Sequence, residues 1–298
     1  RKHIKVEPSR WYMHCDREGI LVWQDLPSPN LPEGHEAFAR QNFEEEAVRI
    51  IDAFENHPSI VQWVVFNEGW GQFDTEWMTQ VVIDKVSPQS LVCCASGWND
   101  AEIGDIKDSH SYPYPSCPID QKRACVNGEY GGITLKVPGH IWPGGDFGYT
   151  TVETPEDFTV MFNDLADKIK DHYYYGLNAA VYTQLSDVEI EKNGIYTYDR
   201  RILKPYSPTG ELKDKILECI NMPQSDVKIQ PVVSTAKEHK YKWKFITEDN
   251  APRHWFAKGF DDSLWPKGTA AFGKSSLWNT QGLISIPWTT PQIYMRRW

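Results

Sequence analysis

Apolar and polar positions between residues 10 and 187 follow two alternating patterns. Continuous apolar runs, which are typical of strands buried on both faces, occur at residues 20–23, 61–66, 91–95, 124–126 and 179–182. Apolar residues with helical spacing occur at 10–18, 43–56, 75–86 and 155–173. A further short strand is expected at 108–112. Strands that alternate with helices predict an α/β fold built on a parallel sheet.

Breakers and charged residues mark where these helices begin and end. Gly19 is expected to end the first helix, and Pro58 stops the second. Pro155 suits the first turn of the longest helix, where Glu156 and Asp157 complement its positive end.

Polar residues stand at the carboxyl end of each predicted strand. A (β/α)8 TIM barrel gathers those ends on one face, where its active site lies. No glycine-rich phosphate loop follows the first strand, which disfavours a doubly wound sheet. The sequence therefore predicts a (β/α)8 barrel in which Arg1 to His3 end an earlier strand. On this interpretation the first strand lies upstream, and both chain ends are cuts in a longer protein. The strand-end residues are Asp25, Asn67, Glu68, Trp98, His110, Tyr112, Glu129 and Gln184.

The pattern changes after about residue 221. Residues 1–221 are predicted to form the barrel, and 222–239, with Pro223 and Pro231, to form a linker. Residues 240–298 are rich in Trp, Gly, Pro and Thr and lack helical spacing. They are expected to form part of an all-β sandwich.

Composition restricts the class of partner. The 298 residues carry a net charge of -10, so nucleic acid and anionic membranes are disfavoured as partners. No apolar stretch approaches the roughly 18 residues of a membrane span. The six Cys show no zinc spacing, and the adjacent Cys93 and Cys94, which lie inside an apolar run, are expected to be buried thiols. No metal and no cofactor is predicted, and no esterase or metalloprotease motif occurs.

Two glutamates at strand ends suggest a specific chemistry. Glu68 follows Asn67 and precedes a Gly-Trp-Gly run, and Glu129 lies between Gly128 and Tyr130. Either alone could be a surface turn carboxylate. Paired carboxylates on one barrel face, however, are what glycoside hydrolysis requires, since one donates a proton and the other attacks or activates water. Among the 13 Trp, most of which are expected in the core, Trp23, Trp70 and Trp98 could stack on sugar rings.

Ordered motifs over residues 1–200 resemble the catalytic barrel of glycoside hydrolase family 2. The resemblance implies a retaining enzyme with Glu68 as the general acid/base and Glu129 as the nucleophile. Arg1 would hold the nucleophile ionised, Asn67 would bond the sugar 2-hydroxyl, and Tyr112 would hydrogen-bond the nucleophile. The family's usual aromatic after the eighth strand is replaced by Thr183-Gln184. The motifs are Arg1-Lys2-His3, Trp11 to Asp25, His57 to Ile60, Asn67-Glu68 and Gly128 to Gly131.

These observations predict a retaining, exo-acting β-glycosidase, most like a β-galactosidase, with a carbohydrate substrate. The alternatives are β-mannosidase specificity, favoured by Trp23-Gln24-Asp25, β-glucuronidase specificity, or a non-catalytic carbohydrate-binding protein. Family resemblance implies a periplasmic or extracellular location and leaves homo-oligomerisation open. The run from Gly259 to Trp265 resembles a galactose-binding-like jelly roll. The predicted substrate-binding residues are Arg1, His3, Asp25, Asn67, Trp70, Trp98, His110, Tyr112 and Gln184.

Overall fold

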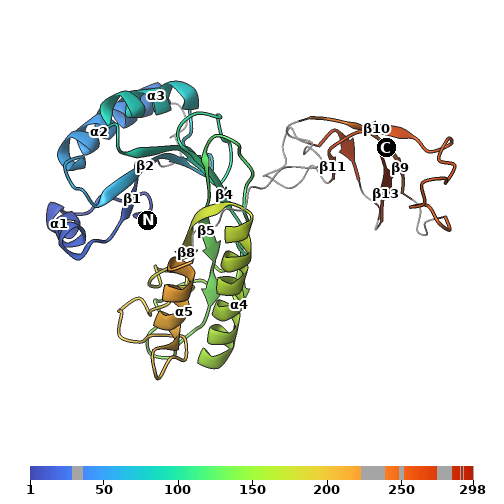
Figure 1. The fold of residues 1–298 in the computed structure, drawn as a ribbon. Helices are drawn as coiled ribbons and strands as arrows, with labels where there is room; N and C mark the ends of the chain where they lie inside the picture. Colours follow the sequence, from blue (N-terminus) through green and yellow to red (C-terminus); the bar gives the residue numbers. More distant parts are fainter. Residues whose placement is uncertain are drawn as a thin grey trace. The chain divides into compact units, whose positions relative to one another are not determined.

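The chain divides into two compact units, residues 1–228 and 229–298 (Figure 1). The computed structural model describes residues 1–28, 36–222, 239–247, 252–273, 284–288, 290 and 292–297. The predicted linker falls almost wholly outside these residues, so its bounds stay a prediction.

Six parallel strands form the frame of the first unit, and all six were predicted. Strands β1 (Val22–Asp25), β2 (Ile60–Asn67) and β3 (Leu91–Ser96) form one sheet in the order β1-β2-β3. Strands β4 (Ile106–His110), β5 (Ala124–Gly131) and β8 (Leu177–Thr183) form a second, in the order β4-β5-β8. The two sheets adjoin where the Asp105 amide donates to the Val92 carbonyl at 2.8 Å. Lys2 pairs in parallel with Gln24, as expected for the end of an earlier strand.

The strands curve around a shared apolar layer, as the strands of a TIM barrel do. Among the residues that the structure describes, no pairing joins β8 to the edge held by Lys2, so the barrel is open there. The layer takes side chains from successive strands, namely Trp23, Val64, Cys93, Ile106, Val126 and Ala179. Trp23 is partly buried against this layer, and its role as a sugar-stacking face stays a prediction. Cys93 is a free, buried thiol, as predicted.

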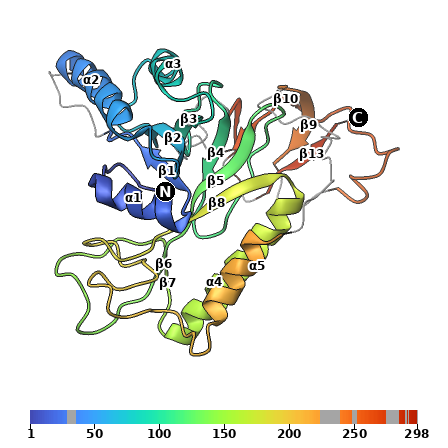
Figure 2. The same ribbon diagram turned by 60° about the vertical axis from the view of Figure 1, so that its left-hand side comes forward.

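Helices cover the outside of this frame (Figure 2). Helix α1 (Ser9–Glu18) ends at Gly19 as predicted, and Gly19 adopts a left-handed conformation at φ 70°. Helices α2 (Glu36–Phe54) and α3 (Thr75–Lys85) share a core with β1–β3 that includes Trp63, Phe66 and Met78. Helix α4 (Pro155–Tyr174) begins as predicted, since Thr154 caps it by accepting a hydrogen bond from the Asp157 amide at 3.1 Å.

Two local predictions need correction, and three elements were not anticipated. Ile20 and Leu21 lie before β1 and are exposed, because the Ile20 amide still bonds the Cys15 carbonyl at the end of α1. Trp77, expected on the buried side of α3, is half exposed. Helix α5 (Glu211–Ile220) and the short parallel pair β6 (Ile133–Thr134) and β7 (Thr150–Thr151) were not anticipated.

No helix within the described ranges has the length and apolarity of a membrane span.

The second unit contains short strands. Strands β10 (Lys267–Thr269), β9 (Lys242–Ile246) and β13 (Tyr294–Arg296) form an antiparallel sheet in that order. Strands β11 (Phe272–Gly273) and β12 (Ile286–Pro287) form a parallel pair. Trp265, from the predicted jelly-roll motif, is buried against Phe260. These strands are compatible with an all-β unit, and the jelly-roll assignment stays a prediction.

Candidate active site

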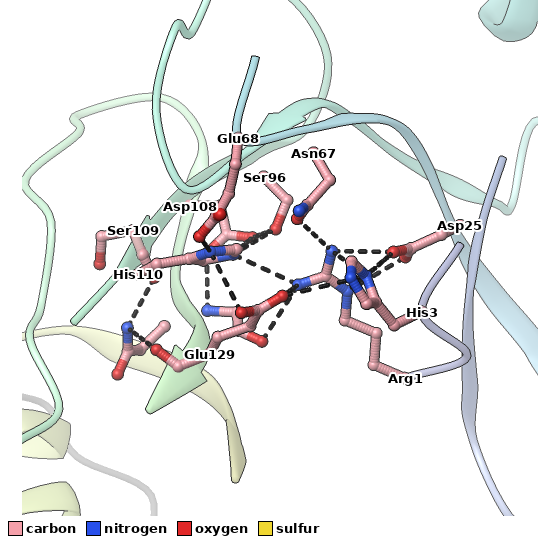
Figure 3. A network of polar contacts seen from close by, with 12 residues as sticks. Arg1, His3, Asp25, Asn67, Glu68, Ser96, Asp108, Ser109, His110 and Glu129 are labelled. Atoms are coloured by element: carbon pink, nitrogen blue, oxygen red, sulfur yellow. Dashed lines mark hydrogen bonds and ion pairs between the residues drawn. The ribbon is translucent and has the colours of Figure 1, made fainter. Parts of the chain in front are cut away.

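A buried guanidinium links three strand ends at the carboxyl face of the barrel (Figure 3). Arg1 donates to Asp25 at the end of β1 at 2.8 Å and to Asn67 at the end of β2 at 2.8 Å. A third donor of Arg1 lies 3.0 Å from Oε1 of Glu129 on β5. The side chains of Arg1 and Asp25 are almost fully buried. Residues far apart in sequence therefore meet around one cation, as the barrel prediction required.

The surrounding charges keep this cluster ionised. Burial alone would raise the pKa of Glu129, but Arg1, His110 and His3 hold it below its usual range. Burial would also raise the pKa of Asp25, and Arg1 together with a hydrogen bond from His3 lowers it to about 2. Charge pairing thus outweighs desolvation for both carboxylates.

Tyr112 completes the surroundings of Glu129. Its hydroxyl donates to Oε2 of Glu129 at 2.6 Å and lies 3.1 Å from the Thr183 hydroxyl. Burial and the adjacent charge of Glu129 raise the pKa of Tyr112, so the hydroxyl keeps its proton and remains a donor. The ring of Tyr149 stacks on Tyr112 with centroids 3.6 Å apart. Burial and Glu129 raise the pKa of Tyr149 to about 12.

Glu68 stands opposite Glu129 in different surroundings. Its backbone has φ 52°, in the left-handed region that non-glycine residues seldom adopt. Its carbonyl accepts a 3.0 Å hydrogen bond from the Trp98 indole, which anchors the turn. Oε1 of Glu68 lies 2.8 Å from Nδ1 of His110, and this His110 nitrogen is 3.5 Å from Glu129. One side-chain oxygen of each glutamate and a nitrogen of His110 all lie within 4.8 Å of one another.

The same three atoms could also coordinate a metal ion. Each of them already has a hydrogen-bond or ion-pair partner within the cluster, so their arrangement is accounted for without one.

A second layer beneath His110 was not predicted from the sequence. Nε2 of His110 lies 2.7 Å from the Ser96 hydroxyl, which donates to the buried carboxylate of Asp108 at 2.5 Å. The Gly128 amide donates to the other Asp108 oxygen at 2.6 Å. Glycine is required at 128, because a Cβ there would lie 2.2 Å from Asp108. The sequence did contain a signal for Asp108 as a site residue. It precedes His110 by two positions on one strand, and such residues share a face.

The remaining predicted residues lie at the edge of the cluster. His3 contacts Asp25 at 2.8 Å, and the half-exposed ring of Trp70 lies 6.4 Å from the His3 ring. Gln184 donates to Glu191 at 3.1 Å and to Asn193 at 2.8 Å. All of the predicted site residues are thus located at or beside the site. Their roles remain to be tested.

Glu191 and Tyr149 are additions that the sequence did not single out. Burial, and after it the charge of Glu129, raises the pKa of Glu191. Glu191 pairs in parallel with Phe147, whose ring packs edge-on against Tyr149 at 5.4 Å. Both residues belong to long connections after β5 and β8, where no strand-end pattern marks them.

A parallel barrel with paired glutamates at its carboxyl face defines the class of glycoside hydrolases. The family model described as "Glycosyl hydrolases family 2, TIM barrel domain" matches residues 7–218. The chain belongs to glycosyl hydrolase family 2. A search of curated protein sequences gives no significant match.

Solved structures agree with this fold. The chain is similar to a GH2 beta-galacturonidase from Eisenbergiella tayi bound to galacturonate, with TM-score 0.53 and 15% identity, covering 72% of this chain and 43% of that one. It is also similar to the beta-glucuronidase of Ruminococcus gnavus, with TM-score 0.50 and 14% identity, covering 70% of this chain and 42% of that one. At such identities the likeness establishes the fold alone. Because the match covers 43% and 42% of these two enzymes, the chain spans less than half of their length.

Proposed function

We propose that this protein is a retaining β-glycosidase in which Glu129 is the nucleophile and Glu68 the general acid/base. The observation that carries the proposal is their spacing, since an oxygen of each lies within 4.8 Å of the other. Retaining enzymes place the two carboxyl groups about 5–5.5 Å apart, whereas inverting enzymes need about 6.5–9.5 Å to admit a water.

The contacts of each glutamate support its role. Arg1 and Tyr112 favour ionised Glu129, which suits attack on the anomeric carbon. In the first step a Glu129 oxygen bonds to the anomeric carbon while the glycosidic bond breaks and Glu68 protonates the departing oxygen. In the second step Glu68 takes a proton from water, and the resulting hydroxide replaces Glu129 at that carbon. We assign to Asn67, whose side-chain oxygen accepts from Arg1 at 2.8 Å, the hydrogen bond to the sugar 2-hydroxyl.

The charge of the site favours a neutral sugar, with a β-galactoside as the first candidate. Glu191 lies close enough to Glu129 and Glu68 to feel their charges, so a uronate would enter an acidic site, and the Arg1 guanidinium is already held by its own partners Asp25, Glu129 and Asn67. A uronide is the second candidate, because the similar solved enzymes are named for galacturonide and glucuronide cleavage. Kinetics of the full-length protein on aryl β-galactosides, β-mannosides, β-glucuronides and β-galacturonides decide between them.

Two substitutions in the full-length protein test the catalytic assignments. Glu129→Gln is expected to abolish turnover of aryl β-glycosides, and a wild-type rate would refute the nucleophile. Glu68→Ala is expected to retain cleavage of dinitrophenyl glycosides and to gain rate from added azide, because azide can replace the activated water. Equal loss on every leaving group without azide rescue would refute the acid/base. Glu76→Gln, an exposed carboxylate on α3, is the matched control.

A non-catalytic carbohydrate-binding protein is the competing function. It would bind sugars while the wild-type protein cleaves none of the glycosides in the panel. We also propose residues 240–298 as part of a galactose-binding-like module, which glycan binding by the full-length protein and its loss on deletion of these residues would test.

A further inference from the structure

Four side chains form an unbroken hydrogen-bonded row from Glu68 into the barrel (Figure 3). Oε1 of Glu68 lies 2.8 Å from His110 Nδ1, and His110 Nε2 lies 2.7 Å from the Ser96 hydroxyl. The Ser96 hydroxyl lies 2.5 Å from Asp108 Oδ2. The side chains of His110 and Asp108 are each only 1% exposed, so water does not interrupt this row. Mutating only Glu68 would not reveal what the other three do.

With a neutral His110 ring, proton counting allows this row two arrangements. In the first, Ser96 donates to ionised Asp108, His110 donates from Nε2 to Ser96, and Glu68 carries a proton that it donates to Nδ1. In the second, protonated Asp108 donates to Ser96, Ser96 donates to Nε2, and His110 donates from Nδ1 to ionised Glu68. Both contain the same number of protons. In the second arrangement the proton of each hydrogen bond lies on the opposite partner from the first. As a result, the carboxyl proton is on Asp108 and not on Glu68.

The groups that face this row bear on both arrangements. Arg1 lies 3.3 Å from His110 Nε2, and Glu129 lies 3.5 Å from Nδ1. The Gly128 amide donates to Asp108 in either arrangement, because it contacts the oxygen that Ser96 does not. Burial raises the pKa of Asp108, and the charges of His110 and Arg1 oppose this rise. Cys93, beside Asp108, has a raised pKa through burial and stays neutral.

We propose that Asp108 is a positioning residue that sets, through Ser96 and His110, whether Glu68 holds a proton. This inference rests on the proposed function, in which Glu68 is protonated before the first step and ionised after it. Ionised Asp108 fixes the His110 tautomer whose Nδ1 accepts a hydrogen bond from protonated Glu68. Protonated Glu68 is the form that protonates the leaving group. When Glu68 has given its proton to the leaving group, the row holds one proton fewer than in either arrangement, and the proton that Glu68 takes from water in the second step restores it.

Asp108→Asn is the sharpest single test, because the amide has the same shape and one oxygen. That oxygen can still accept from Gly128, while the amide nitrogen donates to Ser96 and so favours the second arrangement. Glu68 then loses its proton more readily. The basic limb of the kcat/KM profile, which reports the acid of the free enzyme, is expected to move down by about one pH unit. The shift should appear with phenyl β-glycosides and vanish with dinitrophenyl β-glycosides, which need no acid.

Ser96→Ala distinguishes an effect carried through the row from an effect of losing the Asp108 charge. It keeps Asp108 but interrupts the row, and His110 Nε2 can then accept from Arg1, so the basic limb is again expected to fall. Because the row acts as a unit, the double variant should shift no further than the larger single variant. The control is Ser109→Ala on the same strand, whose hydroxyl contacts Ser116 at 2.9 Å and not the row. Its profile should match the wild type.

The proposal is overturned if the basic limb of Ser96→Ala does not move. It is also overturned if Asp108→Asn shifts the basic limb equally in the wild-type protein and in the Ser96→Ala variant. If Asp108→Asn fails to fold, the comparison of Ser96→Ala with Ser109→Ala decides the matter alone. Failure of the proposed function is a different result, because the wild-type protein would then cleave no glycoside and give no profile.

Discussion

Tyr112→Phe removes one hydrogen bond from Glu129 and leaves the ring in place. The lost contact is the 2.6 Å bond from the Tyr112 hydroxyl to Oε2. Arg1 still faces the other oxygen at 3.0 Å, so Glu129 keeps its main cation. The stacked ring of Tyr149, with an interplanar angle of 2°, holds the phenylalanine in the same position.

The size of the effect follows from the kind of bond. A hydrogen bond to a charged acceptor is worth about 1.5–3 kcal/mol, and about 1.36 kcal/mol corresponds to one pKa unit. Only 13% of the Glu129 side chain is exposed, so water does not replace the lost donor fully. The pKa of Glu129 is therefore expected to rise by about 1–2 units. The direction is upward because the hydroxyl stabilises the ionised form.

The assay is the pH dependence of kcat/KM for an aryl β-glycoside. The acid limb should move up by about 1–2 pH units, and the plateau should fall by roughly 10–100-fold if most of the bond energy acts in the transition state. Tyr130→Phe is the control, since Tyr130 lies on the same strand as Glu129 but packs in the core against Tyr182. An acid limb that stays in place in Tyr112→Phe would refute the argument that this hydroxyl keeps Glu129 ionised.

Two further substitutions test the framework of the site. Asp25→Asn should lower the free energy of unfolding at pH 7 by about 2–5 kcal/mol, because it leaves the buried Arg1 short of a partner; urea unfolding measures this. Since the folded pKa of Asp25 is about 2 against an ordinary 3.8, its contribution is present above pH 4 and is lost as the pH falls toward 2. The difference between variant and wild type should therefore narrow in acid, and a constant difference would contradict the pairing. Gly97→Ala should reduce cleavage of poor leaving groups at least tenfold, because its Cβ would lie 2.9 Å from His110 Nδ1. Gly19→Ala, which has a similar positive φ but no neighbour within 4 Å, should cost stability alone, and equal kinetics in the two variants would argue against the His110 contact.

The sequence was sufficient to predict the strands and the residues at their ends. An apolar run buried on both faces cannot continue into solvent, so its end is marked by the first polar residues, as at Asn67-Glu68 on β2. Parallel strands bring those ends together, and this is why Arg1, Asp25 and Glu129 could be grouped before any coordinates were known. The helix ends at Gly19 and Pro155 follow from backbone chemistry that acts within a few residues.

What the sequence did not reveal depends on contacts between distant segments. Tyr149 and Glu191 lie in long connections, and only tertiary packing brings them beside Glu129. Trp23 packs against an apolar layer that strands distant in the sequence build together. The Ser96–Asp108 contact joins two strands that belong to different sheets, and no local pattern encodes that pair.

The two glutamates illustrate how position in the fold can assign different roles to one residue type. Glu129 accepts its shortest hydrogen bonds from Arg1 and Tyr112, which favour its ionised form, and His110 lies farther from it at 3.5 Å. Glu68 meets His110, whose ring can donate or accept, so its surroundings permit both states. A nucleophile needs a fixed charge, whereas an acid/base must change its charge within each turnover. The difference between the two sets of neighbours therefore supports the assignment independently of the spacing between the carboxylates. His110, which the Ser96 hydroxyl connects to the buried carboxylate of Asp108, lies closer to Glu68, at 2.8 Å, than to Glu129, at 3.5 Å.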